Sequence, residues 1–357
     1  MKQYTVAIIG AGIAQLHAKG FGWLKDRFDV RVLCSLDEER GRRAVEKFDI
    51  PEYTSDFDAV LRRDDIDIID ICTPPDLHFE MCRKALAAGK HVICEKPLFG
   101  SIAEVDEMID LQREAGKALM PIFQYRFGMG LQKLRYLMAK GLTGEAFLTT
   151  IETHWWRDAD YYAVDWRGKW ATELGGGLLG HAIHAHDMLN YVHGASAEVF
   201  AMTDTLVNPI ETEDTAALCV RMANGSLASL SMTLGSRREI SRLRFAFRDL
   251  VAESQTEPYT MFRDPWTFVA ENAEHQEKVD AALAEYDHHE DSYTRQFELF
   301  HEALETDGEL PVTLQDARNS LELITAAYQS SRENRPVKLP LDEKHPLYRS
   351  WLPNAPS

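Results

Sequence analysis

Residues 4–15 read YTVAIIGAGIAQ, and this stretch decides the fold. The apolar run over 4–9 predicts a buried strand, and Gly10 and Gly12 follow it at once. Apolar and small residues then recur at helical spacing from 13 to 24. A strand, a glycine-rich turn and a helix, in that order, predict the first βαβ unit of an α/β domain.

The same turn predicts a dinucleotide site. Gly10 permits a tight turn, and Gly12 lets the backbone approach a pyrophosphate, which the N–H groups and positive dipole end of the next helix would hold. We therefore expect Gly10, Gly12, Ile13 and Ala14 to bind the cofactor. Gln15 stands where the usual pattern has a third glycine, so the alternative is a plain strand–helix turn.

Strand and helix patterns alternate as far as residue 123. Apolar runs predict the strands, and periodic segments with charged residues predict the helices between them. We expect strands at 30–34, 66–72, 91–95 and 118–123, and helices at 37–48, 78–90 and 102–115. Such alternation implies parallel strands, and therefore a Rossmann domain over residues 1–123.

The pattern changes over residues 124–357, where we expect an α+β domain with a mainly antiparallel sheet. A helix near 131–140 precedes a strand-like stretch at 147–156. Asn224-Gly225 separates two further strand-like runs. This dipeptide suits a tight two-residue hairpin turn, whose two central positions both need a positive φ.

The last segment has two features. Thr313 and Asp316 match a capping box before a helix that runs to about Ser331. The tail over 337–353 is rich in proline. We expect it to extend over the surface, where it can pack back on the first domain.

Composition limits the partners and the compartment. Lys and Arg number 39 and Asp and Glu 57 in 357 residues, so the formal net charge is −18. A negative field repels phosphate, so we expect no nucleic-acid or membrane partner. No apolar stretch has the length of a transmembrane helix, and no secretory signal precedes the first strand. Five cysteines without a CxxC pair fit reduced thiols in the cytoplasm.

The tip of the second strand bears on the choice between NAD and NADP. An acidic residue at this place binds the ribose hydroxyls of NAD. Ser35 stands where we expect that acid, and Arg40 and Arg42 follow. A hydroxyl and a guanidinium accept a 2′-phosphate that a carboxylate would repel, which favours NADP slightly. In the alternative, Asp37 binds the ribose and both arginines are solvated.

Three further motifs make the prediction specific. Cys72-Thr73-Pro74-Pro75 ends one strand, Glu95-Lys96-Pro97 ends the next, and residues 175–187 read GGGLLGHAIHAHD. Together they resemble the glucose–fructose oxidoreductase / inositol dehydrogenase / rhizopine catabolism (Gfo/Idh/MocA) family of NAD(P)-dependent sugar oxidoreductases. The resemblance covers nearly the whole chain, and the Glu-Lys-Pro element is its most specific marker.

The resemblance implies a Rossmann domain followed by a domain with a large open sheet, whose faces pair between subunits to give homodimers or homotetramers. It implies that Lys96 is the active-site lysine and His184 the catalytic histidine, both in contact with substrate. It also places Gln124 and Arg126 where nicotinamide and substrate meet. The residues expected at the cofactor are Thr73, Pro74, Pro75, His78, Glu95, Lys96 and Gln124.

The chemistry of alcohol oxidation fits Lys96 and His184 independently. A histidine titrates near neutrality and can take the hydroxyl proton. A lysine at the carboxyl end of a strand, where open α/β sheets bind ligands, can hold the alcohol oxygen and stabilise developing negative charge. The alternative for Lys96 is a solvated charge after a strand.

One position departs from the family pattern. The family carries an acid four residues before the catalytic histidine, and here that position is Gly180. Ala182 also replaces a usual glycine. His181 lies beside the vacancy, so we expect it to take part of the role of the acid and to contact the substrate.

The histidines of this motif also raise the possibility of a metal site. His181 and His184 can share a helical face, and so can His184 and Asp187. His186 points away from His184, and no further ligand stands in register. We therefore expect no metal, and we expect His186 to be structural.

An aromatic segment supplies the remaining candidates. Residues 154–170 read HWWRDADYYAVDWRGKW. Sugar faces pack on aromatic rings, and a guanidinium pairs with a carboxylate. We expect Trp156, Arg157, Trp166 and Arg167 to bind substrate. The alternative is a packed loop at a subunit interface, where the same residue types are enriched.

These expectations combine into one function, an NAD(P)-dependent oxidoreductase that acts on the CH–OH group of a sugar, polyol or sugar derivative. One alternative is a glycosidase that oxidises its substrate transiently and releases an aglycone without a net change in NAD(P)H. Another is a cofactor-binding sensor whose catalytic site decayed at Gly180.

Overall fold

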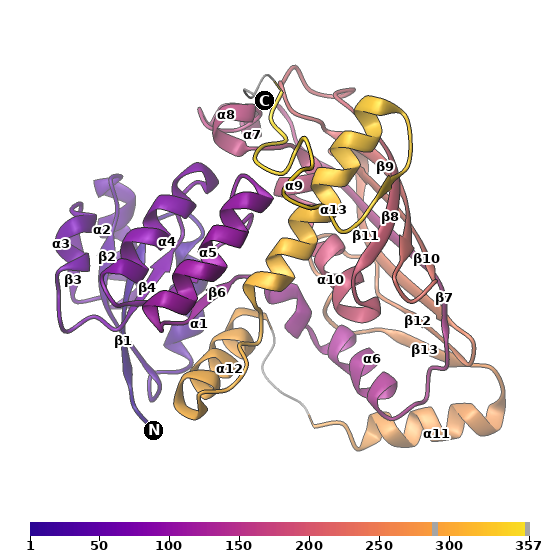
Figure 1. Cartoon of the computed structure of the whole chain (residues 1–357). Helices are drawn as coiled ribbons and strands as arrows, with labels where there is room; N and C mark the ends of the chain where they lie inside the picture. Colours follow the sequence, from indigo (N-terminus) through magenta and orange to yellow (C-terminus); the bar gives the residue numbers. More distant parts are fainter. Residues whose placement is uncertain (288–291, 354–357) are drawn as a thin grey trace. The chain divides into compact units, whose positions relative to one another are not determined.

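The computed structural model describes residues 1–287 and 292–353. The chain forms two compact units, Met1–Gln124 with Ser292–Ala317, and Tyr125–Asp291 with Arg318–Ser357. The first unit therefore includes a helix from late in the chain, α12 (Ser292–Thr306), which Figure 1 colours orange beside indigo and purple elements.

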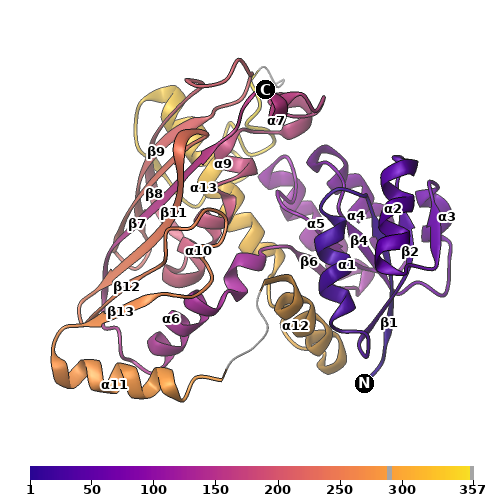
Figure 2. The same cartoon turned by 180° about the vertical axis from the view of Figure 1, so that it is seen from behind.

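The first unit has the expected Rossmann architecture. Its strands pair in parallel in the order β3-β2-β1-β4-β5-β6, the order found in dinucleotide-binding folds. Helices α4 and α5 cover one face of the sheet in Figure 1, and α1 covers the other face in Figure 2. The strands are β1 (Tyr4–Ile9), β2 (Phe28–Cys34), β3 (Glu52–Thr54), β4 (Ile68–Ile71), β5 (His91–Cys94) and β6 (Leu119–Pro121). The helices are α1 (Ala14–Gly22), α2 (Glu38–Phe48), α3 (Phe57–Leu61), α4 (His78–Ala87) and α5 (Ile102–Ala115).

The second unit is an α+β domain around a large sheet. Its described strands pair in the order β13-β12-β11-β7-β10-β9-β8-β14, all antiparallel except β7 with β10. The strands are β7 (Ala146–Trp156), β8 (Ser196–Asp204), β9 (Thr215–Met222), β10 (Leu227–Thr233), β11 (Gly235–Phe247), β12 (Leu250–Glu253), β13 (Thr267–Ala270) and β14 (Val337–Lys338). The helices are α6 (Met129–Ala139), α7 (Ala159–Tyr162), α8 (Trp170–Glu173), α9 (Gly177–Gly180), α10 (Ile183–His193), α11 (Ala273–Ala284) and α13 (Leu314–Glu333).

Helices α6, α10 and α13 lie along one face of this sheet (Figures 1 and 2). Strands β8, β9 and β10 alternate between buried residues and more exposed ones, as a sheet covered on one side does. The residues on the other side form a shallow depression of about 350 Å³. We call this side the outer sheet face, and it includes Thr150, Glu152, Phe200, Met202, Ala217, Cys219, Ser229 and Ser231.

The hairpin at Asn224-Gly225 forms, but with a different turn. Strands β9 and β10 pair antiparallel across it, as expected. Of the two residues Asn224 and Gly225, only Gly225 has a positive φ, at 90°, so the turn is not the expected two-residue type. Three residues, 223–225, form the loop, and the Asn224 side chain accepts hydrogen bonds from the N–H and hydroxyl of Ser226 at 3.0 and 2.7 Å. Asn224 acts through its side chain rather than through a left-handed backbone.

The C-terminal tail belongs to the second unit and is anchored there. Its first residues form β14, which pairs with β8. Trp351 is fully buried, and its Nε1 donates to the carbonyl oxygen of Leu174 at 2.7 Å. Most of residues 337–353 are nevertheless exposed or half-buried, so Trp351 is a local apolar anchor of a tail that otherwise lies at the surface of the second unit. The capping box before α13 is confirmed, since Thr313 and Asp316 exchange hydrogen bonds at 2.8 and 3.2 Å.

Among residues 1–287 and 292–353, no helix is both long and apolar enough to cross a membrane. All five cysteines are unpaired thiols, and only Cys219 is exposed.

A buried imidazole connects several elements of the first unit. His17 lies in α1, and its Nδ1 is 2.9 Å from both carboxylate oxygens of Asp70 in β4. Its Nε2 is 2.9 Å from Oε1 of Glu95, the residue after β5. Tyr293 of α12 donates to the same Glu95 oxygen at 2.8 Å. We call these four residues the His17 network. It joins β4 and the end of β5 to two helices, α1 from the start of the chain and α12 from near its end.

Charge holds this network together. Burial alone lowers the pKa of His17, but the charges and hydrogen bonds of Asp70 and Cys72 together outweigh burial and raise that pKa well above its ordinary value. Burial likewise opposes ionisation of Glu95, but the hydrogen bond and charge of His17 lower the pKa of Glu95 to about 2. Burial raises the pKa of Asp70, and His17 offsets part of that effect. At neutral pH an imidazolium therefore stands between two buried acids.

Replacing His17 with alanine should lower the free energy of unfolding by about 3–5 kcal/mol at neutral pH, because two acids stay buried without their common partner. Urea denaturation measures this loss. The exposed Lys84–Asp58 pair provides a control, since Lys84→Ala should cost only about 0–1 kcal/mol. A loss below about 1 kcal/mol for His17→Ala would contradict the role given to the network.

The difference between parent and His17→Ala should also depend on pH. The folded-state pKa of His17 is raised, so its stabilisation is complete below its unfolded pKa of about 6.5 and is lost as the pH rises through the folded value. The two proteins should therefore converge in stability under alkaline conditions.

Candidate functional site

The glycine turn after β1 has the geometry of a pyrophosphate site. Gly10 has a φ of 111°, and a Cβ there would lie 2.5 Å from the carbonyl oxygen of Cys72, so only glycine fits. A Cβ at Gly12 would meet nothing within 4 Å, which leaves its backbone open to a ligand. Helix α1 begins at Ala14, and no side chain caps its N–H groups, with Ile13 at the N-cap. The turn and the helix N-terminus therefore fit a dinucleotide.

The tip of β2 carries the residues expected to distinguish NAD from NADP. Ser35 is largely buried, and its Oγ accepts a hydrogen bond from the N–H of Asp37 at 3.1 Å. Oδ1 of Asp37 accepts from the N–H of Arg40 at 3.0 Å and so caps α2. The Arg40 guanidinium is exposed, with Nε 3.8 Å from Oδ2 of Asp37. A carboxylate and a guanidinium thus stand together beside Ser35.

His78 ties two loops at the carboxyl edge of the sheet. Its ring is fully buried, with Nε2 2.9 Å from the carbonyl oxygen of Thr73 and Nδ1 2.9 Å from that of Pro97. Both ring nitrogens therefore face backbone carbonyls, and His78 fixes the positions of the two loops relative to each other. Between them, Pro74 precedes a single 3-10 turn that starts at Pro75.

Lys96 is the second residue after β5 and is half-buried, and its peptide bond to Pro97 is cis. Its backbone N–H donates to Oε2 of Glu95 at 2.9 Å. The Glu95 carboxylate thus points into the His17 network and, at the same time, holds the backbone of Lys96. The network places this lysine at the edge where parallel sheets bind ligands.

Gln124 extends the same network. It is buried, and its Nε2 donates to the hydroxyl of Tyr293 at 3.0 Å. Sequence reasoning missed His17, Asp70 and Tyr293. Tyr293 comes from α12, so no local pattern near the Rossmann motifs could indicate it.

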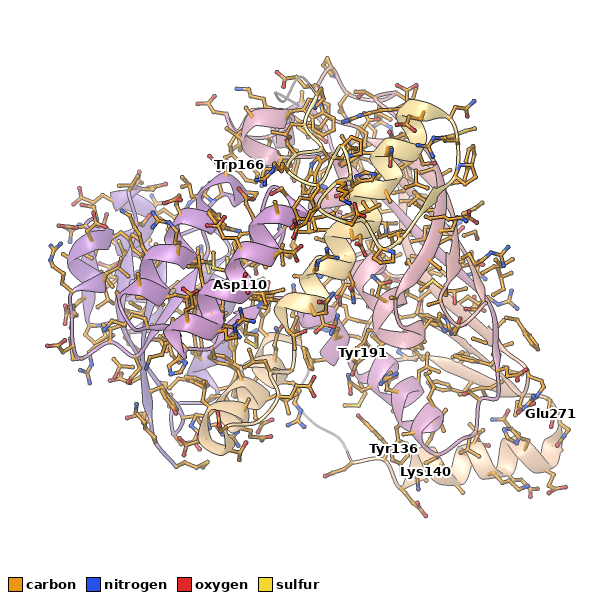
Figure 3. The ribbon with its side chains drawn as sticks, in the orientation of Figure 1. Asp110, Tyr136, Lys140, Trp166, Tyr191 and Glu271 are labelled. Carbon is orange, nitrogen blue, oxygen red and sulfur yellow. The ribbon has the colours of Figure 1, made fainter. Side chains whose placement is uncertain are left out.

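In the second unit, Arg126 forms a buried ion pair. Its Nε and Nη2 donate to the two carboxylate oxygens of Asp187 at 2.7 and 2.5 Å. The guanidinium also lies 4.9 Å from the ring centre of Tyr191, whose side chain is labelled on α10 in Figure 3. The bidentate geometry gives Arg126 a strong structural partner in the middle of α10.

The two catalytic-motif histidines of α10 have different surroundings. The ring of His184 stacks on Tyr125 with centroids 4.1 Å apart and planes 16° apart, and Tyr125 packs in turn on Phe262. His186 is buried, and burial lowers its pKa to about 4. The side chain of His184 is thus held by an aromatic stack, while His186 has the environment of a core residue.

His181 takes part in a polar cluster with the aromatic segment. Arg157 Nε donates to His181 Nε2 at 3.3 Å, so this nitrogen acts as an acceptor. The hydroxyl of Tyr161 lies 3.1 Å from the same nitrogen. Arg157 also donates to the hydroxyl of Tyr259 at 2.8 Å, and Tyr259 donates to Glu239 at 2.5 Å. Tyr259 and Glu239 come from beyond the segment, and sequence reasoning missed both.

The other residues expected at the substrate flank this cluster. Arg167 lies over the ring of Tyr161 at 3.8 Å, and its Nη1 donates to the Tyr161 carbonyl oxygen at 3.2 Å. Trp166 precedes it between α7 and α8, as labelled in Figure 3. Trp156 ends β7, and the guanidinium of Arg237 covers its ring at 3.5 Å. The structure brings Arg157, Arg167 and His181 around Tyr161, but Trp156 packs on a different cation.

Gly176, directly before α9, is required by close packing on Glu213. A Cβ at Gly176 would lie 1.9 Å from the Glu213 carbonyl oxygen. The Glu213 carboxylate accepts from the N–H groups of Gly176 and Leu178 and from the Tyr328 hydroxyl, at 3.0–3.1 Å. Burial raises the pKa of Glu213 to about 7, although these hydrogen bonds oppose the shift. Glu213 thus holds the loop that leads to His181.

The residues considered for a metal have separate partners. His181 contacts Arg157, His184 stacks on Tyr125, and Asp187 pairs with Arg126. In the described part of the chain, the one group of three ligand-type side chains within 4.8 Å is His17, Asp70 and Cys72. These three already form hydrogen bonds with one another inside the first unit.

Two family models match the chain. The model of the oxidoreductase family with an NAD-binding Rossmann fold matches residues 4–123. The model of the GFO/IDH/MocA C-terminal domain matches residues 131–248. The two matches together cover more than half of the chain.

Individual proteins are similar over long stretches. The chain is 27% identical to the myo-inositol 2-dehydrogenase of Thermotoga maritima, over 94% of this chain and 98% of that protein. It is 32% identical to the D-glucoside 3-dehydrogenase of Escherichia coli over 54% of each chain. The crystal structure of the WlbA dehydrogenase from Bordetella pertussis in complex with NADH and UDP-GlcNAcA has a TM-score of 0.83 and 25% identity, covering 96% of this chain and all of that one. With its glycine turn, its Glu-Lys-Pro element and its histidine helix, the chain belongs to the Gfo/Idh/MocA oxidoreductase family and has the NAD-binding Rossmann fold of that family.

Proposed function

We propose that the protein transfers hydride reversibly between NAD(P) and the CH–OH carbon of a sugar, polyol or sugar derivative. The observation that carries this proposal is that the Glu-Lys-Pro element directly follows β5, with Lys96 held through Glu95 by the His17 network. The myo-inositol and D-glucoside dehydrogenases similar to this chain support the substrate class. The unpaired thiols suit the cytoplasm, where we place the protein.

In this proposal Lys96 binds the substrate hydroxyl oxygen and stabilises the negative charge that develops on it. His184 takes the hydroxyl proton, with its ring plane set by the stack on Tyr125. The residues that hold the dinucleotide are the turn at Gly10 and Gly12 and the N-terminus of α1. The bound nicotinamide supplies the hydride acceptor.

Alanine variants of the two residues test the mechanism. Lys96→Ala and His184→Ala should each lower kcat by about 10²–10⁴-fold on the best substrate of a sugar and polyol panel, because each removes a positioned acid–base or charge-stabilising group. NADH binding, followed by fluorescence, should survive in both. His186→Ala serves as the control and should affect stability more than kcat, since His186 is a core residue.

Normal turnover in His184→Ala would refute this residue as the base. Release of an aglycone without a net change in NADH would instead favour the glycosidase alternative.

We propose NADP as the slightly better cofactor, because Ser35 puts a hydroxyl where an acid would repel a 2′-phosphate and Arg40 is exposed nearby. Ser35→Asp should shift the ratio of the NADP and NAD dissociation constants toward NAD by about tenfold, or about 1.4 kcal/mol. Ser35→Ala is the matched control without a charge. Titration calorimetry measures both constants, and much tighter NAD binding by the parent would overturn the preference.

We also propose a homodimer or homotetramer that pairs outer sheet faces. Exposed apolar residues such as Met202 and Leu227 lie on this side of the sheet, where a second copy of the chain would cover them. Met202→Arg should give monomers at micromolar concentration, measured by light scattering, because a cation would be buried without a partner. Trp23→Arg, at an exposed site of the first unit, is the control. A monomeric parent protein would contradict this assembly.

A further inference from the structure

The position that lacks a side chain, Gly180, faces a carboxylate from another element. Glu173 is the last residue of α8, and it is only 5% exposed. A Cβ built on Gly180 would lie 3.6 Å from Oε1 of Glu173, and apart from the chain neighbours and backbone of its own helix no other atom comes within 4 Å of it. A glutamate oxygen therefore approaches the space that a side chain at position 180 would enter.

The distance is close to what a carboxylate at position 180 would require. Standard bond lengths put an aspartate oxygen about 2.4 Å from its own Cβ. Oε1 of Glu173, at 3.6 Å, is therefore within roughly 1–2 Å of the positions that such an oxygen could reach. One carboxylate fits this space, and two would be forced into contact.

The local structure aims the Glu173 carboxylate in this direction. Its Oε2 accepts a hydrogen bond from the N–H of Gly168 at 2.5 Å, which orients Oε1 toward Gly180. Leu174 follows with a φ of 65°, and its carbonyl oxygen is bonded by buried Trp351. The C-terminal tail therefore helps to fix the turn that carries Glu173.

The carboxylate also lies next to the cluster around His181. Its negative charge contributes to the raised pKa values of Tyr161 and Tyr162, although burial is the larger cause for both. The hydroxyl of Tyr161 contacts Nε2 of His181 at 3.1 Å. Glu173 is thus near both the start of the histidine helix and the aromatic segment.

We infer that Glu173 supplies the carboxylate of the histidine site that Gly180 cannot supply. It acts as a positioning residue: from α8 it orients the segment of His181 and His184 and favours the cationic form of the site after the proton has moved to it. This inference rests on the proposed dehydrogenase function. It also explains why Gly180 is tolerated in a chain that keeps the rest of the motif.

Four variants test the inference, because Gly180→Asp should have opposite effects on kcat in the parent and in the Glu173→Gln background. Glu173→Gln keeps the shape and an oxygen acceptor for Gly168 but removes the charge, so kcat should fall on the order of 10²-fold with NADH binding and melting temperature near those of the parent. Addition of Gly180→Asp to the Glu173→Gln variant should raise kcat at least tenfold above that of Glu173→Gln alone. Gly180→Asp alone should lower kcat, because two carboxylates would share one buried space. Gly180→Ala should behave like the parent, since its Cβ makes only an ordinary contact.

Glu322 provides a control for loss of any buried carboxylate in the second unit. It is buried on α13 and pairs with Arg318 at 2.9 Å. Glu322→Gln should change the melting temperature rather than kcat. Parent-like kcat in Glu173→Gln, or failure of Gly180→Asp to restore activity in that background, would overturn the inference while the dehydrogenase function stands. A parent protein without turnover on the whole panel would overturn the proposed function and this inference together.

Discussion

The first unit depends on one shared positive charge. His17 stands between Asp70 and Glu95 in a core that excludes water, and removal of the imidazole would leave both acids without a partner. The same contact determines where the Glu-Lys-Pro element points, because Glu95 uses one oxygen for His17 and the other for the backbone of Lys96. The Glu95 carboxylate thus both stabilises the core through His17 and positions Lys96.

The second unit positions its histidines by a different principle. Short helices α8 and α9 make few backbone hydrogen bonds, so buried acids hold their turns. Glu213 binds the N–H groups at the start of α9, and Glu173 binds the N–H of Gly168. Asp187 lies in α10 and fixes the position of this helix through its ion pair with Arg126. Glu173 just before the histidine motif, Asp187 within it and Glu213 beyond it therefore each fix one part of that region.

Local patterns predicted much of the fold. Five of the six Rossmann strands, the glycine turn, the hairpin position and the capping box each depend on residues close together in the chain, and all of these were predicted; β3 was not. Strand β3 has only three residues and no buried one, so it carries no hydrophobic signal. The turn at Asn224 was given the wrong type, because asparagine can act either through its backbone or through its side chain. The anchor of the tail was not predicted, because Trp351 finds its partner, Leu174, far back in the sequence.

The sequence by itself determined the α/β class, the dinucleotide turn and the residues of the family motifs, because spacing and residue type act over a few positions. Only the tertiary structure decided which partners those residues have. It brings Tyr293 to Glu95, and Glu173 to the space beside Gly180, from separate elements. Such pairings depend on how helices and strands pack, since a buried charge must find its partner wherever the folded chain places one.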